Sequence, residues 1–317
     1  MLQDTNSMAS SRALKDKMQT VKNISQITKA MEMVSATKMR KSQEVALRAR
    51  PYAQKALSLL SRIATVIYNE RLKGTFVDRR EINKVALVVV TSDKGLCGSY
   101  NSAVLRKASE WKEEQESEGK EVDIIAVGRK GRDYFVHRKA TLAQEFIQFS
   151  DIVTMSDAKP LIDWILETYA EGNYGKVMFC LTFFESALVQ RVEIHQVLPL
   201  EKEFIERVVK GIVPTTGKYA HLDRLGNDED LQYTLEPSPG EIVEDLIRDL
   251  VQVEITHLIF EANASEHSAR MMAMKNATEN AQNLKDELNL ELNKARQTAI
   301  TQELSEISSA KEALMSE

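Results

Sequence analysis

Hydrophobic residues in the C-terminal part of the chain recur at the spacing of a helix. From Glu241 to Glu317 the sequence contains no glycine and no proline, which predicts one continuous helix. At ~1.5 Å per residue, this helix would be on the order of 110 Å long. A compact domain formed by this chain would be narrower, so we expect part of the helix to leave the globular body and pack against another helix.

A heptad pattern inside this segment predicts how the helix packs. Apolar residues fall at two alternating sets of positions, namely Met274, Ala281, Leu288 and Ala295, and Ala277, Leu284, Leu292 and Ala299. Such positions form the seam of a left-handed coiled coil. The same pattern also fits a surface helix on a globular core, so a coiled coil requires a partner helix elsewhere in the chain.

The N-terminal part of the chain supplies a partner of the same kind. Between residues 9 and 73 there is no glycine and one proline, Pro51, which we expect to kink or break the helix. One apolar stripe at helical spacing consists of Leu14, Met18, Val21, Ile24, Ile27, Met31 and Val34. We interpret the first ten residues as a disordered lead-in, and the two terminal helices as an antiparallel coiled coil.

The other faces of the N-terminal helix are strongly basic. Residues 12–50 include ten lysines and arginines but only three acidic residues. This excess fits either a solvated surface or a contact with an acidic partner.

The segment between the helices alternates strands with helices. Residues 84–91 are continuously apolar and β-branched, as in a parallel strand that is buried on both faces. Further strands are expected at 122–127, 141–146, 177–184 and 189–197, with an antiparallel hairpin between the last two. Helices are expected at 101–118, after 128, and at 156–169 with Ser156 as N-cap. This alternation predicts a Rossmann-like α/β unit.

The predicted fold class is therefore α/β, an antiparallel coiled coil of the two long terminal helices with an inserted Rossmann-like α/β domain. The expected segments are an N-terminal helix at 1–80, the α/β domain at 81–239 and a C-terminal helix at 240–317. The run Pro237-Ser238-Pro239-Gly240 marks the last boundary.

Composition narrows the class of protein. The 317 residues are 43% hydrophobic and 28% charged with a formal charge of -5, and this mild acidity argues against a general nucleic-acid binder. Cys97 and Cys180 lie beside apolar runs, which indicates buried, reduced thiols. No apolar run reaches the ~18 residues of a membrane span, and we identify no signal or transit peptide.

Candidate chemistry is confined to one loop. The residues from Ser92 to Ser99 lie between a strand and a helix, where backbone N–H groups can bind an anion. The loop lacks the spacing of a Walker loop or a dinucleotide fingerprint, so a tight turn with close packing is the favoured interpretation. The five histidines show no metal-ligand spacing. We therefore predict no catalytic, cofactor or metal site.

Three separated runs of sequence carry a resemblance to a known family. They are Ile27-Thr28-Lys29-Ala30-Met31-Glu32-Met33-Val34 followed by Lys38-Met39-Arg40, then Thr91-Ser92-Asp93-Lys94-Gly95-Leu96-Cys97-Gly98, and finally Ser265-Glu266-His267-Ser268-Ala269-Arg270-Met271-Met272-Ala273-Met274 with Asn293-Lys294-Ala295-Arg296-Gln297-Thr298-Ala299-Ile300-Thr301-Gln302-Glu303. In this order they resemble the gamma subunit of F-type ATP synthases, of the bacterial type. The resemblance covers essentially the whole chain.

The resemblance implies a rotor shaft without catalysis or a cofactor of its own. The coiled coil would turn inside a ring of alpha and beta subunits, while the α/β domain meets the epsilon subunit and the c-ring, whose rotation is driven by protons. One copy per complex would lie at the cytoplasmic face of the bacterial inner membrane, as a peripheral protein. A structural coiled-coil adaptor and a Rossmann-like enzyme remain the alternatives.

The resemblance also implies site residues. Those matching beta-subunit contact and coupling positions are Lys29, Met31, Arg270, Arg296, Gln297 and Thr301. Tyr233 and Glu236 match positions where the family contacts the c-ring.

Overall fold

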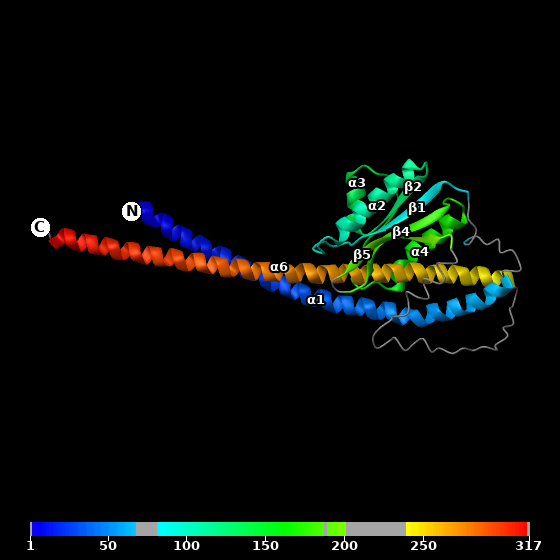
Figure 1. The fold of residues 1–317 in the computed structure, drawn as a ribbon, viewed down its shortest axis with the longest axis horizontal. Helices are drawn as coiled ribbons and strands as arrows, with labels where there is room; N and C mark the ends of the chain where they lie inside the picture. Colours follow the sequence, from blue (N-terminus) through cyan, green and yellow to red (C-terminus); the bar gives the residue numbers. More distant parts are fainter. Residues whose placement is uncertain (1, 68–75, 77–80, 187–188, 201–238, 316–317) are drawn as a thin grey trace. The chain divides into compact units, whose positions relative to one another are not determined.

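The computed structural model describes the chain except for residues 1, 68–75, 77–80, 187–188, 201–238 and 316–317 (Figure 1). The chain begins and ends with long helices, α1 (Leu2–Ile67) and α6 (Pro239–Met315). The elements between them are β1 (Lys84–Val90), α2 (Tyr100–Ser117), β2 (Glu121–Val127), α3 (Arg129–His137), β3 (Leu142–Phe146), α4 (Met155–Ala170), β4 (Lys176–Phe184) and β5 (Gln190–Leu198). The predicted α/β class with two long terminal helices is confirmed.

The five strands form one sheet in the order β3-β2-β1-β4-β5. The first four strands are parallel, so Val88 of β1 lies between Ile125 of β2 and Phe179 of β4. Strand β5 is antiparallel to β4, which confirms the predicted hairpin. All but the first residue of β1 are buried, as its continuous apolar sequence predicts for a central parallel strand.

Helices cover both faces of the sheet. Helices α2 and α3 pack on one face, where Leu87 and Val89 of β1 meet Val104 and Phe135. Helix α4 and the first part of α6 pack on the other face. This larger core includes Val88, Phe179, Leu161, Ile165, Val251, Ile255 and Leu258. The beginning of the C-terminal helix is therefore an integral part of the α/β core.

The chain divides into two compact units. One unit consists of residues 1–35 and 270–317, and the other consists of residues 36–269. Helices α1 and α6 each contribute to both units, because neither helix ends at the division. The division thus differs from the expected segments 1–80, 81–239 and 240–317, which follow chain order.

The first unit is an antiparallel pair of helices. Val21 and Leu14 of α1 pack with Ala281 and Leu288 of α6. One hydrogen bond joins the Oγ1 atoms of Thr28 and Thr278 at 2.7 Å. Residue 21 of α1 packs with residues 281 and 288, whereas residue 28 contacts residue 278. The residue numbers thus rise along α1 while they fall along α6, so the two helices are antiparallel. The predicted seam positions Met274, Ala281 and Leu288 are buried.

The predicted apolar stripe of α1 is wrong in its second half. Ile24, Ile27 and Val34 are 47%, 59% and 51% exposed, whereas Thr28 and Ser35 are buried. The buried positions follow Val21 at intervals of seven, and Ser42 continues the series. Three residues make less than one helical turn, so Ile24 and Ile27 lie progressively farther around α1 from Val21 and from the heptad seam. These apolar side chains therefore form an exposed stripe beside the seam. On α6, Leu284 is likewise exposed rather than buried in the seam.

Three further expectations about the helices need correction. Helix α1 begins at Leu2 rather than after a disordered lead-in, and no glycine or proline precedes residue 11. It also continues through Pro51 instead of breaking there. Helix α4 is capped by Thr154 rather than Ser156, since Asp157 accepts hydrogen bonds from the N–H and the hydroxyl of Thr154.

Candidate functional site

The loop between β1 and α2 is held by its own side chains. Asn101 Oδ1 accepts a hydrogen bond from the N–H of Ser92 at 3.0 Å, and Asn101 Nδ2 donates to Cys97 Sγ at 3.1 Å. Ser92 Oγ donates to the carbonyl of Lys94 at 2.6 Å. The chain has positive φ at Leu96 and Gly98, as tight turns require. This geometry favours the interpretation of the loop as a tight turn over that of an anion site.

The carboxyl ends of β1 and β2 approach each other closely. Thr91 Oγ1 donates to the carbonyl of Val127 and accepts from the N–H of Gly131, both at 2.8 Å. A side chain at Gly128 would place its Cβ 2.2 Å from the carbonyl oxygen of Thr91. Gly128 also has a φ of 87°, so glycine is required there on both grounds. The first turn of α3 is therefore fixed against the end of β1.

Asp93 extends this network to the loop that follows β3. Its Oδ1 accepts a hydrogen bond from the N–H of Arg129 at 2.8 Å, and its Oδ2 accepts one from the N–H of Phe149 at 2.9 Å. One carboxylate thus connects the ends of three parallel strands.

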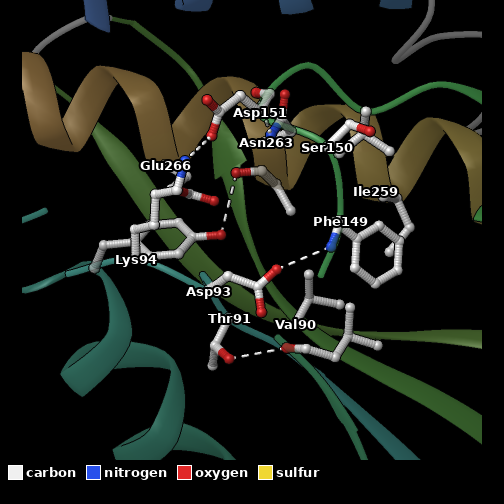
Figure 2. Close-up of a pocket in the computed structure, with 14 residues that line it drawn as sticks. Val90, Thr91, Asp93, Lys94, Phe149, Ser150, Asp151, Ile259, Asn263 and Glu266 are labelled. Carbon is white, nitrogen blue, oxygen red and sulfur yellow. Dashed lines mark hydrogen bonds and ion pairs between the residues drawn. The ribbon is translucent and has the colours of Figure 1, made fainter. Parts of the chain in front are cut away.

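A small cavity of about 50 Å³ lies at this edge of the sheet (Figure 2). The helices that follow β1 and β2 lie on one face of the sheet, whereas α4, which follows β3, lies on the other face. The carboxyl end of β1 is therefore the topological switch point of the sheet. Doubly wound folds bind their ligands at such a point. Helix α6 closes this place, since Ile259 and Asn263 line the cavity and Tyr100 Oη donates to the carbonyl of Ala262 at 3.1 Å. The chain's own helix therefore lies where such folds hold a ligand.

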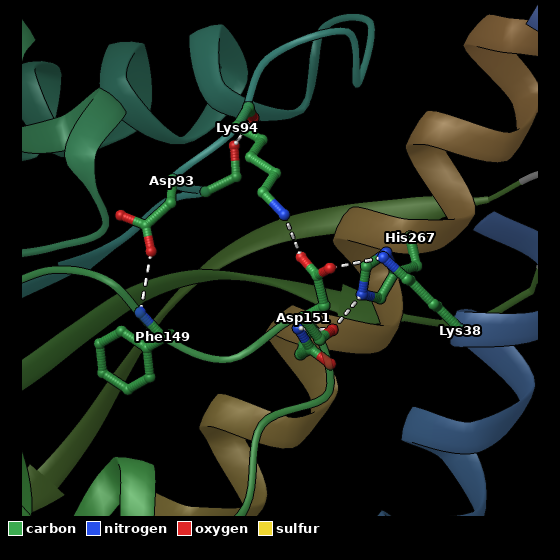
Figure 3. Close-up of polar contacts among 8 residues, drawn as sticks. Lys38, Asp93, Lys94, Phe149, Asp151 and His267 are labelled. Carbon is green, nitrogen blue, oxygen red and sulfur yellow. Dashed lines mark hydrogen bonds and ion pairs between the residues drawn. The ribbon is translucent and has the colours of Figure 1, made fainter. Parts of the chain in front are cut away.

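Asp151, beside the cavity, contacts three separate parts of the chain (Figure 3). Its carboxylate accepts hydrogen bonds from Nζ of Lys38 on α1 and Nζ of Lys94 in the β1–α2 loop, each at 2.6 Å. Its backbone carbonyl accepts from His267 Nε2 at 2.5 Å and from Asn263 Nδ2 at 3.4 Å, both on α6. All of these residues belong to the unit formed by residues 36–269.

The charges at this junction fix its protonation state. The hydrogen bonds from Lys38 and then Lys94 lower the pKa of Asp151 to about 2, so the carboxylate is ionised at neutral pH. A carbonyl oxygen can only accept, so His267 must carry a proton on Nε2. The His267 ring is buried, which holds it in this orientation.

The junction unites the three sequence runs described above. Lys38 comes from the first, Lys94 from the second and His267 from the third, although more than 200 positions separate the outer two. Asp151 itself was missed by sequence reasoning. It lies in a connecting loop without a motif, and no local signal distinguishes it from any other exposed aspartate.

The residues matched to beta-subunit contacts differ in their exposure to solvent. Lys29 is exposed and pairs with Glu32 at 3.0 Å, Met31 is half-buried, and Arg270 is buried. Arg296, Gln297 and Thr301 are exposed on α6, and Thr301 Oγ1 donates to the carbonyl of Gln297 at 2.9 Å. The structure brings this last group together on one stretch of helix. Tyr233 and Glu236 lie outside the described residues.

The two cysteines are buried, as predicted, and neither forms a disulfide. Burial raises the pKa of the Cys180 thiol to about 12. Within the described part of the chain, no group of three or more histidine, cysteine, aspartate or glutamate side chains is arranged to hold a metal ion. None of the helices, over the residues described, combines the length and the apolar character that a membrane span needs.

Comparison with known proteins shows similarity over nearly the full length of the chain. A family model described as "ATP synthase" matches residues 10–314. The "ATP synthase gamma chain" of Chloroflexus aurantiacus is 38% identical over 310 residues, which cover 98% of this chain and all of the relative.

Solved structures share the fold. The central stalk and c-ring structure of the Tetrahymena thermophila mitochondrial ATP synthase contains a chain with a TM-score of 0.56 and 22% identity, covering 79% of this chain and 99% of that one. A chain in the Euglena gracilis mitochondrial ATP synthase structure has a TM-score of 0.60 and 18% identity, covering 96% of this chain and 95% of that one.

Proposed function

Because the chain belongs to the family of ATP synthase gamma chains, we propose that it is the central rotor shaft of an F-type ATP synthase. In this role it couples proton-driven rotation of a c-ring to conformational change in a ring of alpha and beta subunits. One copy serves each complex, and ATP synthesis or hydrolysis takes place in the surrounding subunits rather than in this chain.

The observation that carries this proposal is the pair of long terminal helices in a chain that matches the family over nearly its full length. Helix α6 has 77 residues, about 115 Å at about 1.5 Å per residue, and α1 has 66 residues. In the unit formed by residues 1–35 and 270–317, their antiparallel pairing gives a two-stranded shaft. Two interlocked helices resist twisting in a way that a single helix does not.

The side chains on this unit support contacts with a surrounding ring. Exposed apolar residues on α1 and α6, among them Ile24, Ile27, Ile300, Leu304 and Ile307, are unusual on a solvated surface. Contacts that differ among the conformations of three beta subunits would shift each subunit to a different state.

We assign beta-subunit contact and coupling to the residues that match the family pattern. Arg296, Gln297 and Thr301 offer hydrogen-bonding groups on one exposed stretch of α6, and Lys29 offers a cation on α1. Met31 is half-buried on another face of α1, and the buried Arg270 would act through the packing of α6. The epsilon subunit and the c-ring are assigned to the α/β domain, with Tyr233 and Glu236 at the c-ring.

This assembly places the chain at the cytoplasmic face of the bacterial inner membrane, as a peripheral protein. The neighbours named above were solved in mitochondrial complexes described as central stalk with c-ring and as F1 with c-ring, which supports assembly with a c-ring. The ring, not this chain, would conduct the protons.

Reconstitution tests the proposal. The purified chain is added to its cognate alpha and beta subunits, and complex formation and ATP hydrolysis are recorded with and without it. We expect a complex with one copy of the chain, a changed rate of hydrolysis and no ATPase activity of the chain alone. Failure to form a complex, with the rate unchanged, would favour the structural adaptor instead.

A further inference from the structure

The loop at Asp151 connects both terminal helices to the sheet. Its carboxylate accepts from Lys38 of α1, and its backbone carbonyl accepts from His267 and Asn263 of α6. Two positions earlier, the N–H of Phe149 donates to Asp93, which lies three residues after the end of β1. A single loop thus receives contacts from the sheet on one side and from two helices on the other.

A second contact links α1 to the same place. Ser42 lies one helical turn after Lys38, so their side chains share a face of α1. Ser42 Oγ donates to Asn263 Oδ1 at 2.6 Å, and Asn263 Nδ2 donates in turn to the carbonyl of Asp151. Helix α1 is therefore held at two successive turns, by a charge pair and by a relay of hydrogen bonds.

These contacts suit a joint that must not slip. Apolar packing is non-directional, so it fixes the rotation of one element against another less specifically than directed polar contacts do. Hydrogen bonds depend steeply on angle, and those between charged partners are shorter and stronger. Lys94 adds a second cation to Asp151 from the β1–α2 loop, which keeps the carboxylate oriented between the sheet and α1.

We propose that Asp151, with Lys38 and Lys94, is the joint that fixes helix α1 to the α/β domain, so that rotation of this domain turns the shaft without slippage. The proposal rests on the rotor function proposed above. Helix α1 runs without a break from this joint into the helix pair of the other unit, so torque applied at Asp151 passes along a continuous backbone. Asp151 is a positioning residue that acts through Lys38 and Lys94.

The test compares ATP hydrolysis with ATP-driven proton pumping in the complete ATP synthase complex, reconstituted in lipid vesicles. Asp151→Asn removes the charge and keeps the size of the side chain, and Lys38→Met removes only the charged contact from α1. The matched control is Asp163→Asn, which breaks an exposed ion pair with Lys159 inside helix α4. We expect Asp151→Asn and Lys38→Met to lose proton pumping per ATP hydrolysed, and the control to pump as the wild type does.

The ratio separates a joint from a general effect on stability. A variant that only folds or assembles poorly lowers hydrolysis and pumping together and leaves their ratio unchanged, which would overturn the proposal. If Asp151→Asn does not fold, Lys38→Met decides by the same ratio. A wild-type chain that assembles but does not support pumping would contradict the rotor function itself, whereas equal ratios in all variants beside an active wild type would contradict only the joint.

Discussion

The hydroxyl oxygens of Thr28 and Thr278 lie 2.7 Å apart, although 250 positions separate the two residues in the chain. This hydrogen bond crosses a seam whose other members, such as Val21 and Ala281, are apolar. A polar pair at such a position specifies the register of two helices, because any shift along the axis breaks the hydrogen bond between the two hydroxyls.

Replacing Thr28 by valine should therefore destabilise the helix pair. We expect Thr28→Val to lower the free energy of unfolding by about 1 kcal/mol, since the Thr278 hydroxyl loses its partner across the seam. Thr28→Val with Thr278→Val should cost less than the sum of the two single changes. Urea unfolding followed by far-ultraviolet circular dichroism measures all three. Strict additivity would show that the two hydroxyls do not interact.

Two glycines offer a matched test of the sheet edge. Gly128 and Gly119 both have positive φ, but only Gly128 faces a backbone carbonyl, while a Cβ at Gly119 would meet nothing within 4 Å. Gly119→Ala should cost about 1 kcal/mol from backbone strain alone. Gly128→Ala should cost about 3 kcal/mol or more, because the strand ends must also separate. Equal losses in thermal unfolding experiments would contradict the close approach of Thr91.

Asp151 should stabilise the folded chain only while it is ionised. Its pKa in the folded chain is about 2, below the ordinary 3.8, so the stabilisation is complete above about pH 4 and disappears as the pH falls through 2. The side chain is 41% exposed, and solvent screening therefore limits the contribution to about 1 kcal/mol. Asp151→Asn should lower the urea midpoint at about pH 7 and do so less at about pH 3. A difference that does not change with pH would indicate that charge is not involved.

Arg296 and Gln297 should matter for coupling but not for folding. Both side chains are exposed on α6, so Arg296→Ala and Gln297→Ala should change the free energy of unfolding by less than about 0.5 kcal/mol. We expect each variant to weaken proton-driven ATP synthesis in reconstituted vesicles, because a contact with the beta subunit is lost. Asn283→Ala is the control, since Asn283 is also exposed on α6. Normal synthesis by both variants would remove these two contact assignments.

The sheet could be predicted from the sequence because the pattern of apolar residues in a strand indicates which of its faces are buried. The continuous apolar run at β1 indicated a central parallel strand, and the short turn at Glu185-Ser186 indicated the hairpin of β4 and β5. Strand order followed less directly. The position of β1 at the switch point depends on which face each crossover helix covers, and periodicity alone does not determine this.

The seam of α1 could be predicted only in part. Apolar identity selected Ile24 and Ile27, whereas the packed positions are occupied by Thr28 and Ser35. Small side chains at these positions allow two helices to approach closely, and the Thr28 hydroxyl lies within hydrogen-bond distance of the Ser25 carbonyl and of the Thr278 hydroxyl on the other helix. A strict count in sevens from Val21, rather than a search for apolar residues, would have found the seam.

The junction at Asp151 could not be predicted. Its partners Lys38, Lys94 and His267 are distant in sequence, and each alone has an ordinary interpretation on a helix or in a loop. Only the folded chain shows that the three runs that carry the family resemblance meet at one residue, two at its carboxylate and one at its backbone carbonyl. By contrast, the favoured interpretation of the loop from Ser92 to Ser99 as a tight turn agrees with its hydrogen bonds, which Asn101 makes to Ser92 and Cys97.

The packing of α6 on the sheet has a consequence for how the protein is made. The apolar face that includes Val88, Phe179 and Leu181 is covered by residues near Val251 and Leu258, which the ribosome adds well after β5 is complete. During translation, until α6 is made, this face of the nascent sheet is therefore covered by α4 alone. Folding of the domain should finish only after the first part of α6 has been synthesised, and in that interval the incomplete core exposes apolar surface that favours aggregation.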